Sequence, residues 1–93
     1  MLRMKLSNTM KKQLRKKAHE LHPIVMIGDK GLTEAVQLEI ERGLLDHELI
    51  KIKINNNDRN ERKNIINEIC QTRDAELIQA IGKIAIIYRK NED

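Results

Sequence analysis

At 93 residues the chain is long enough for one domain with a modest core and leaves little room for a second module, so we expect residues 1–93 to form a single domain. Hydrophobic residues make up 40% of it and charged residues 34%, which is typical of a folded soluble domain, and no apolar run approaches the ~20 residues of a membrane span. Residues 1–17 contain seven lysines and arginines and no acid, whereas the rest of the chain contains eleven basic and fourteen acidic residues. This concentrated positive field favours a polyanionic partner, either nucleic acid or anionic lipid.

The first predicted helix begins after Ser7, a favourable N-cap residue, and runs to about residue 20. At 100° per residue its apolar and basic side chains fall on different arcs, so one face should pack while the other faces solvent. The apolar arc contains Leu6, Met10, Leu14, Ala18 and Leu21, and the basic arc contains Lys5, Lys11, Lys12, Arg15, Lys16 and His19. Pro23 prevents a helical continuation, and residues 24–27 predict a short buried strand.

The rest of the chain alternates between the periodicity of a helix and that of a strand. Thr33 can cap a second helix to about His47, with Gly43 on its inner face, and residues 49–54 alternate isoleucine with lysine as a strand with one wet face does. Asp58, with Glu61 three residues later, predicts a third helix to about residue 72. Residues 76–81 and 84–89 predict two strands joined by a tight type II′ hairpin at residues 82–83, followed by a frayed tail.

The predicted order is thus α-β-α-β-α-β-β, which belongs to the α/β class. It implies one compact domain with a mixed four-stranded sheet packed with helices. Because the first and last strands are apolar on both faces, we expect helices to cover at least part of each side of the sheet.

The segment Gly28-Asp29-Lys30-Gly31 stands where a strand passes into a helix. Glycines allow the backbone amides to approach a phosphate closely, the following helix adds free N–H groups, and Lys30 adds a cation. The simpler interpretation is a tight turn that needs glycine for backbone reasons alone. Asp29 opposes phosphate binding unless its side chain turns away or caps an amide.

The basic arc of the first helix also has two interpretations. It can be a solvated face that keeps the protein soluble, although ordinary surface helices mix charges of both signs. We interpret it as a nucleic-acid-binding face. A membrane surface is a poorer fit, because the opposite face supplies core residues and carries no Trp or Phe anchor. Tyr88 is the single aromatic residue, so backbone contacts rather than base stacking should dominate RNA recognition.

The sequence contains little that suggests an enzyme. His19 and His22 could suggest a metal pair, but they are separated across a helix end with no evident third ligand, and Cys70 is the single cysteine. No catalytic triad order, Walker loop or zinc spacing is present. The N-terminal segment lacks the apolar core of a secretory signal. We therefore expect a cytoplasmic protein without catalysis, cofactor, metal or small-molecule substrate.

Three separated motifs, in order, carry a family resemblance. They are LHPIVMIGDKGLT at residues 21–33, HELIK at residues 47–51, and Ile81-Gly82-Lys83 with Tyr88-Arg89. They resemble the CRM domain (chloroplast RNA splicing and ribosome maturation), over almost the whole chain. The length is similar to that of the stand-alone bacterial members, the YhbY-type proteins.

This resemblance implies a fold like the C-terminal domain of translation initiation factor 3, a loop comparable to the GxxG loop of KH domains, and association with precursors of the large ribosomal subunit. The residues that it implicates in RNA binding are Gly28, Asp29, Lys30 and Gly31 in the loop, Lys11, Lys12, Arg15 and Lys16 on the basic surface, and Arg89 as a further contact. Pro23 and Tyr88 are assigned structural roles.

The resulting hypothesis is a monomeric protein that binds the backbone of structured ribosomal RNA during large-subunit assembly. The alternative is an adaptor that docks on the ribosome by placing the same basic helix against an acidic protein surface. Salt dependence distinguishes them, because phosphate contacts release counterions.

Overall fold

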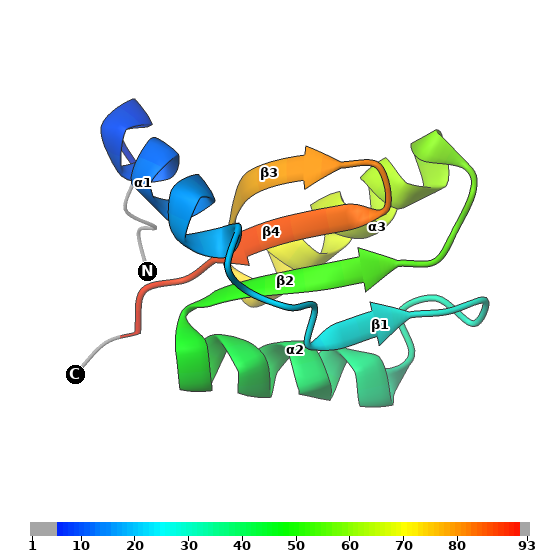
Figure 1. Cartoon of the computed structure of the whole chain (residues 1–93). Coiled ribbons are helices and arrows are strands. Elements are labelled where there is room, and N and C mark those ends of the chain that lie inside the picture. The colour runs from blue at the N-terminus through cyan, green and yellow to red at the C-terminus, as the bar shows by residue number, and fades with distance from the viewer. Residues whose placement is uncertain (1–5, 92–93) are drawn as a thin grey trace.

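The helices and strands form in the predicted order (Figure 1). The computed structural model describes residues 6–91, so Lys5 of the basic arc lies outside the described part. Within that part, no helix has the length and apolar content needed to cross a membrane. The elements are α1 (Asn8–Ala18), β1 (Val25–Ile27), α2 (Glu34–His47), β2 (Leu49–Ile54), α3 (Arg59–Arg73), β3 (Glu76–Ile81) and β4 (Ile84–Tyr88).

Each helix begins at the predicted N-cap. The side chains of Ser7, Thr33 and Asp58 each accept a hydrogen bond from an amide in the first turn of their helix. Glu61 does not accept from the Asp58 amide. Its carboxylate accepts from the Asn56 side-chain amide at 2.7 Å, and the Asp58 amide donates to Asn56 Oδ1 at 2.7 Å. Local capping chemistry therefore sets all three helix starts.

The sheet is mixed, as predicted, with the strand order β1-β2-β4-β3. β1 runs parallel to β2, and the other two pairs are antiparallel. The parallel pair requires a crossover, which α2 supplies. The β3–β4 hairpin turns at Gly82, whose φ of +54° is followed by a negative φ at Lys83, in agreement with the predicted turn type.

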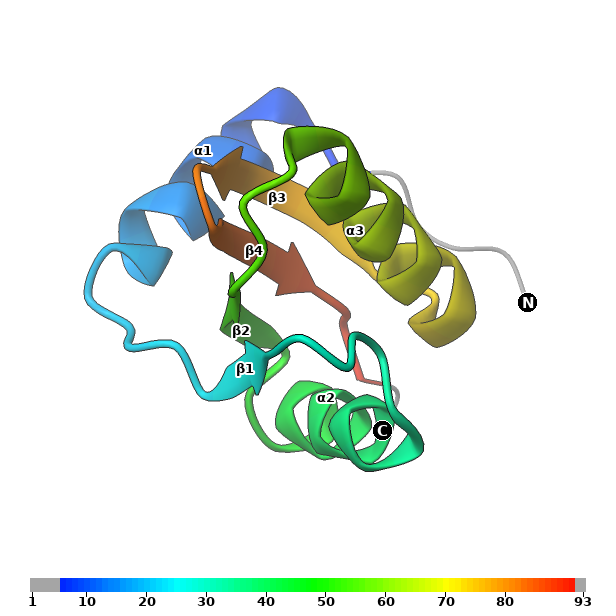
Figure 2. The same ribbon diagram turned by 90° about the vertical axis from the view of Figure 1, so that its right-hand side faces the viewer.

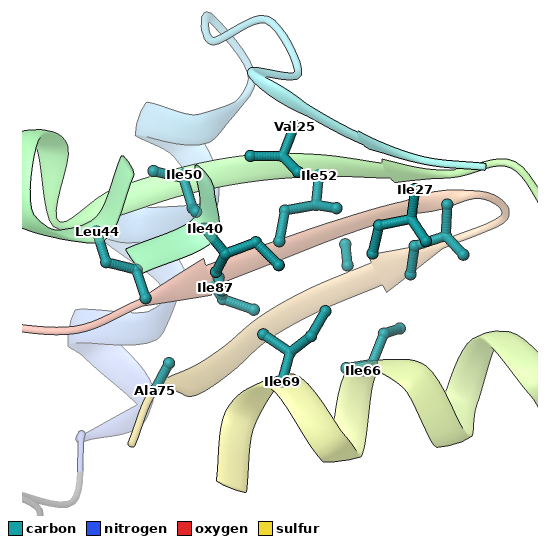
Figure 3. Close-up of a cluster of buried hydrophobic side chains, with 12 residues drawn as sticks. Val25, Ile27, Ile40, Leu44, Ile50, Ile52, Ile66, Ile69, Ala75 and Ile87 are labelled. Atoms are coloured by element: carbon teal, nitrogen blue, oxygen red, sulfur yellow. The ribbon is translucent and has the colours of Figure 1, made fainter. Parts of the chain in front are cut away.

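The main core lies between the sheet and the helices α2 and α3 (Figure 3). The central strand β2 contributes Ile50, Ile52 and Ile54, each of which is no more than 1% exposed. Opposing side chains come from the inner faces of the helices: Ile40 and Leu44 from α2, and Ile66 and Ile69 from α3. Figure 3 shows these side chains pointing toward one another between the sheet and α3.

A second, smaller core lies on the opposite face of the sheet, beneath α1. It consists of Leu6, Ala18, Leu49, Ile78 and Ile86, with Leu14, Ile84 and Tyr88 packed against it. Figure 2 shows α1 on one side of the sheet and α3 on the other. The prediction that helices cover part of each face is therefore confirmed.

The cover that α1 provides ends before β1, so the predicted burial of residues 24–27 is only half right. Val25 and Ile27 are buried in the main core, but Ile24 is 49% exposed and Met26 is 61% exposed. The reason is that α1 contacts β2 and β3 and leaves the face of the edge strand β1 open. Met10 and Leu21, predicted on the packing arc of the first helix, are also exposed, and Leu21 lies beyond the end of α1.

The predicted inner position of Gly43 is confirmed, and it brings α2 close to the sheet. A Cβ atom at this position would lie 2.9 Å from Cδ1 of Ile24 and 3.4 Å from Cγ2 of Ile50. Distances below about 3.0 Å require the neighbour to move. Glycine therefore allows this end of the helix to approach the β1–β2 pair.

The C-terminal segment is held in place at least as far as Asn91. The predicted fraying of the tail is therefore wrong at Asn91. The Asn91 amide donates to the Glu48 carboxylate at 2.7 Å, and its side-chain Nδ2 donates to the carbonyls of Leu44 and Leu45 at 3.2 and 2.8 Å. Carbonyls at a helix C-terminus lack partners within the helix. The tail is therefore held by satisfying the end of α2.

Truncation of two neighbouring residues of β1 should change the free energy of unfolding by very different amounts. Ile27→Ala should lower the free energy of unfolding by about 2–5 kcal/mol, because it leaves a cavity in the main core. Met26→Ala should change it by no more than about 0.5 kcal/mol, because its side chain faces solvent. Urea unfolding followed by circular dichroism measures both, and equal losses would contradict the one-sided burial of this strand.

Candidate nucleic-acid interface

The segment of residues 28–31, here called the GxxG loop, is a single tight turn. The Gly31 amide donates to the Gly28 carbonyl at 3.0 Å, and the Thr33 amide donates to the Gly31 carbonyl at 3.0 Å. Asp29 and Lys30 occupy the corner of the turn and are exposed. Figure 1 shows the loop projecting beyond the end of β1 before the chain enters α2.

The two glycines of the loop have different structural requirements. Gly31 has a φ of +70°, which disfavours other residues, so the backbone itself explains this glycine. Gly28 lies outside the positive-φ region, and a Cβ built on it would meet nothing within 4 Å. The interpretation as a glycine-requiring turn therefore accounts for Gly31 but not for Gly28.

Donors are available on the loop, and two carboxylates lie near them. Within residues 6–91, the amides of Asp29 and Lys30 donate to no protein acceptor, and the exposed Asp29 carboxylate accepts no hydrogen bond. Asp29 thus does not cap an amide, and its side chain is free to turn toward solvent. Glu34 lies in the first turn of α2 and also faces the positive end of that helix dipole. The unpaired amides and Lys30 would attract an approaching phosphate, whereas the carboxylates of Asp29 and Glu34 would repel it.

The basic face of α1 comprises Lys11, Lys12, Arg15 and Lys16. Lys12 and Lys16 are exposed, and Arg15 is partly exposed. None of these three forms an ion pair with another described residue, whereas Lys11 lies 3.9 Å from a carboxylate oxygen of Glu76 on β3. Three of the four predicted contacts therefore present unneutralised charge to solvent.

The structure does not bring the GxxG loop and α1 together. α1 packs over β2 and β3 on the face of the sheet opposite the main core, and the loop extends past the end of β1 (Figure 1). Lys51 and Lys53 lie between them, because their side chains alternate with the buried isoleucines of β2 and Lys53 pairs in register with Met26. These two lysines were not predicted as contacts, although their period-two spacing already placed them on the wet face.

Arg89 occupies a different environment from the other predicted contacts. Its guanidinium donates to both carboxylate oxygens of Glu41 at 2.9 and 2.8 Å and to the Arg73 carbonyl at 3.0 Å. It follows β4, whose last residue Tyr88 pairs with Leu49 at the end of the sheet opposite the GxxG loop. The structure therefore joins Arg89 to α2 and α3 rather than to the loop.

The one aromatic ring of the chain is engaged in packing. Tyr88 packs against the core beneath α1, and this burial, together with the nearby Glu48 carboxylate, raises the pKa of its hydroxyl. The ring is partly buried by this packing, so it is not a freely exposed platform for a base. Within residues 6–91, no group of three potential metal-ligating side chains comes together either.

Comparisons with known proteins agree on one family. The profile of the CRS1 / YhbY (CRM) domain matches residues 6–89. An RNA-binding protein of Haemophilus influenzae is 46% identical over 88 residues, which cover 95% of this chain and 89% of that protein. A probable RNA-binding protein of Pseudomonas aeruginosa is 43% identical over 88 residues, which cover 95% and 85% of the two chains. The solution structure of a Staphylococcus aureus protein, described there as an RNA-binding candidate, has a TM-score of 0.83 at 31% identity and covers 96% of this chain and 93% of that one.

Glu41→Gln should lower the melting temperature at neutral pH, because Arg89 and Arg73 lose their shared carboxylate. The hydrogen bond from Arg89 holds the pKa of the Glu41 carboxyl below its ordinary value of 4.5. The ion pair therefore stabilises the fold fully above that value, and this contribution is lost as the pH falls through the lower pKa of the folded state. The melting temperatures of the unsubstituted protein and of the Glu41→Gln variant should differ at neutral pH and converge in strong acid.

The matched control is Glu39→Gln, which removes an exposed carboxylate of the same helix that forms no ion pair within residues 6–91. Its melting temperature should follow that of the unsubstituted protein across the pH range. A deficit of the Glu41 variant that stays constant into strong acid would rule out the ion pair as its cause.

Proposed function

Because the chain belongs to the CRS1 / YhbY (CRM) domain family, we propose that it binds the sugar–phosphate backbone of structured ribosomal RNA during assembly of the large ribosomal subunit. RNA-binding relatives cover nearly all of this chain, so the same domain carries the activity in both. The protein acts as a cytoplasmic monomer, and its role requires no catalysed step, cofactor or small-molecule substrate.

The observation that carries this proposal is Gly28. The fold requires no glycine there, since neither its φ nor its surroundings exclude a side chain. The missing Cβ instead leaves open space beside the unpaired amides of Asp29 and Lys30. Such space allows a phosphate to reach the main chain directly.

RNA contacts extend from the loop across the open face of the sheet to α1. Lys30 and the loop amides hold one part of the backbone, and Lys51 and Lys53 lie on the way to the basic face of α1. Contacts of this kind recognise the shape and charge of a folded RNA more than its sequence. Arg89 contributes a further contact only where an RNA phosphate competes with Glu41 for its guanidinium.

Removing two charges from α1 should change the salt dependence of RNA binding. Lys12→Gln with Lys16→Gln should reduce the slope of log affinity against log salt by about 1.4 to 1.8, because two phosphates are no longer neutralised. The measurement is a filter-binding or fluorescence titration of large-subunit ribosomal RNA over a series of salt concentrations.

The control is Arg42→Gln with Lys63→Gln, which removes the same charge from exposed positions on α2 and α3, the helices of the opposite face. Its slope should match that of the unsubstituted protein. Equal slopes for both double variants would refute the assignment of α1. Binding to ribosomes with no salt response would favour the protein-docking adaptor.

Gly28→Asp should weaken RNA binding about tenfold or more while leaving the melting temperature unchanged, because the new carboxylate occupies open space where a phosphate approaches. Gly31 is unsuitable for this test, since its positive φ makes any side chain strained. Asp29→Asn should act in the opposite direction and strengthen binding. Unchanged affinity in a folded Gly28 variant would remove the loop from the interface.

A further inference from the structure

A groove unrelated to the GxxG loop lies where four segments meet. It is formed by the end of α1, the connection at residues 19–24, the end of α2 and the start of β2. Its volume of about 530 Å³ lies within the range of ~300–1,000 Å³ that is common for small-ligand sites. The groove is therefore large enough for a nucleoside-sized molecule.

The lining of the groove combines planar rings, aliphatic surface and positive charge. The exposed imidazoles of His22 and His47 are its only planar side chains among the described residues, and Leu21 and Ile24 supply aliphatic surface. Lys17 and Lys51 add two ammonium groups.

Glu20 is the one acid of the lining, so positive charge is in excess. No described ion pair or hydrogen bond engages the two lysine side chains. An uncharged apolar ligand would leave them unused, whereas an anionic ligand with an aromatic part would use every kind of surface present.

We propose that this groove binds one unstacked nucleotide of the RNA, an inference that rests on the proposed function. The base lies against the imidazoles and the aliphatic side chains, since histidine is among the residues on which unstacked bases pack. The phosphates on either side of it are held by Lys17 and Lys51.

The position of the groove favours RNA over a free nucleotide as its occupant. Lys17 directly follows Lys16 of the basic face of α1, and Lys51 precedes Lys53 on the open face of the sheet. An RNA strand that follows these charges from α1 to β2 must pass the groove. The groove thus adds a preference for an unpaired nucleotide to a surface that otherwise grips only the backbone.

The test compares two RNA duplexes that differ by a single bulged adenosine. The bulged duplex should bind the unsubstituted protein more tightly than the fully paired one. In the variant His22→Ala with His47→Ala, affinity for the bulged duplex should fall about tenfold, to the level of the paired duplex. Affinity for the paired duplex should stay unchanged.

The control is Gln71→Ala, which removes an exposed planar side-chain amide on α3 that does not line the groove. It should bind both duplexes as the unsubstituted protein does. An equal loss on both duplexes, or no loss on either, in the double variant overturns the groove assignment and leaves the proposed function intact. Absence of binding to either duplex and to ribosomal RNA by the unsubstituted protein overturns both.

A second measurement locates the bulged nucleotide directly. With 4-thiouridine at the bulge, photo-crosslinking to the unsubstituted protein followed by peptide mass spectrometry should modify residues 17–24 or 47–51. Crosslinks confined to the GxxG loop or to α3 would refute the groove, even where the affinities behave as expected.

Discussion

The alternation of isoleucine and lysine along β2 is the constraint on which the rest of the molecule depends. β2 pairs with β1 on one side and β4 on the other, so its register determines which side chains of the sheet point toward the main core. Its isoleucines point into the core shared with α2 and α3. A shift of one residue would exchange these isoleucines with Lys51 and Lys53 and place two ammonium groups in that core. The same pattern that stabilises the fold therefore keeps a row of positive charge on the opposite face.

That opposite face is only partly covered, and the proposed function depends on this incomplete cover. α1 packs over β2 and β3 and carries its own basic residues outward, while β1 and the GxxG loop stay open. The charged groups thus belong to three parts of the fold, namely α1, β2 and the GxxG loop. Separated charges of this kind act on successive phosphates of a long ligand and add little to the binding of a small anion.

Most of the fold follows from local rules, and most of what does not follow depends on tertiary contacts. Residues that are close together in the sequence are enough to predict the helix caps at Ser7, Thr33 and Asp58 and the period-two alternation of β2. The exposure of Met26 depends on how far α1 extends over the sheet, which no local pattern records. The ion pair of Arg89 with Glu41 joins residues 48 positions apart, and the groove lining comes from two stretches of the chain, residues 17–24 and 47–51. The GxxG loop could be predicted as a candidate, because its glycines lie within four consecutive residues, but only the backbone geometry separates the role of Gly28 from that of Gly31.

The close contact of Gly43 with Ile24 links the interior of the protein to its surface. Ile24 is both the nearest neighbour of the missing Cβ and a wall of the groove beside β2. A single methyl group added at Gly43 on the buried side of α2 would displace this wall without any substitution in the residues that line the groove. Relatives with alanine or serine in place of this glycine would then have a differently shaped groove on an otherwise identical scaffold, so variation deep in the helix could diversify what the surface accepts.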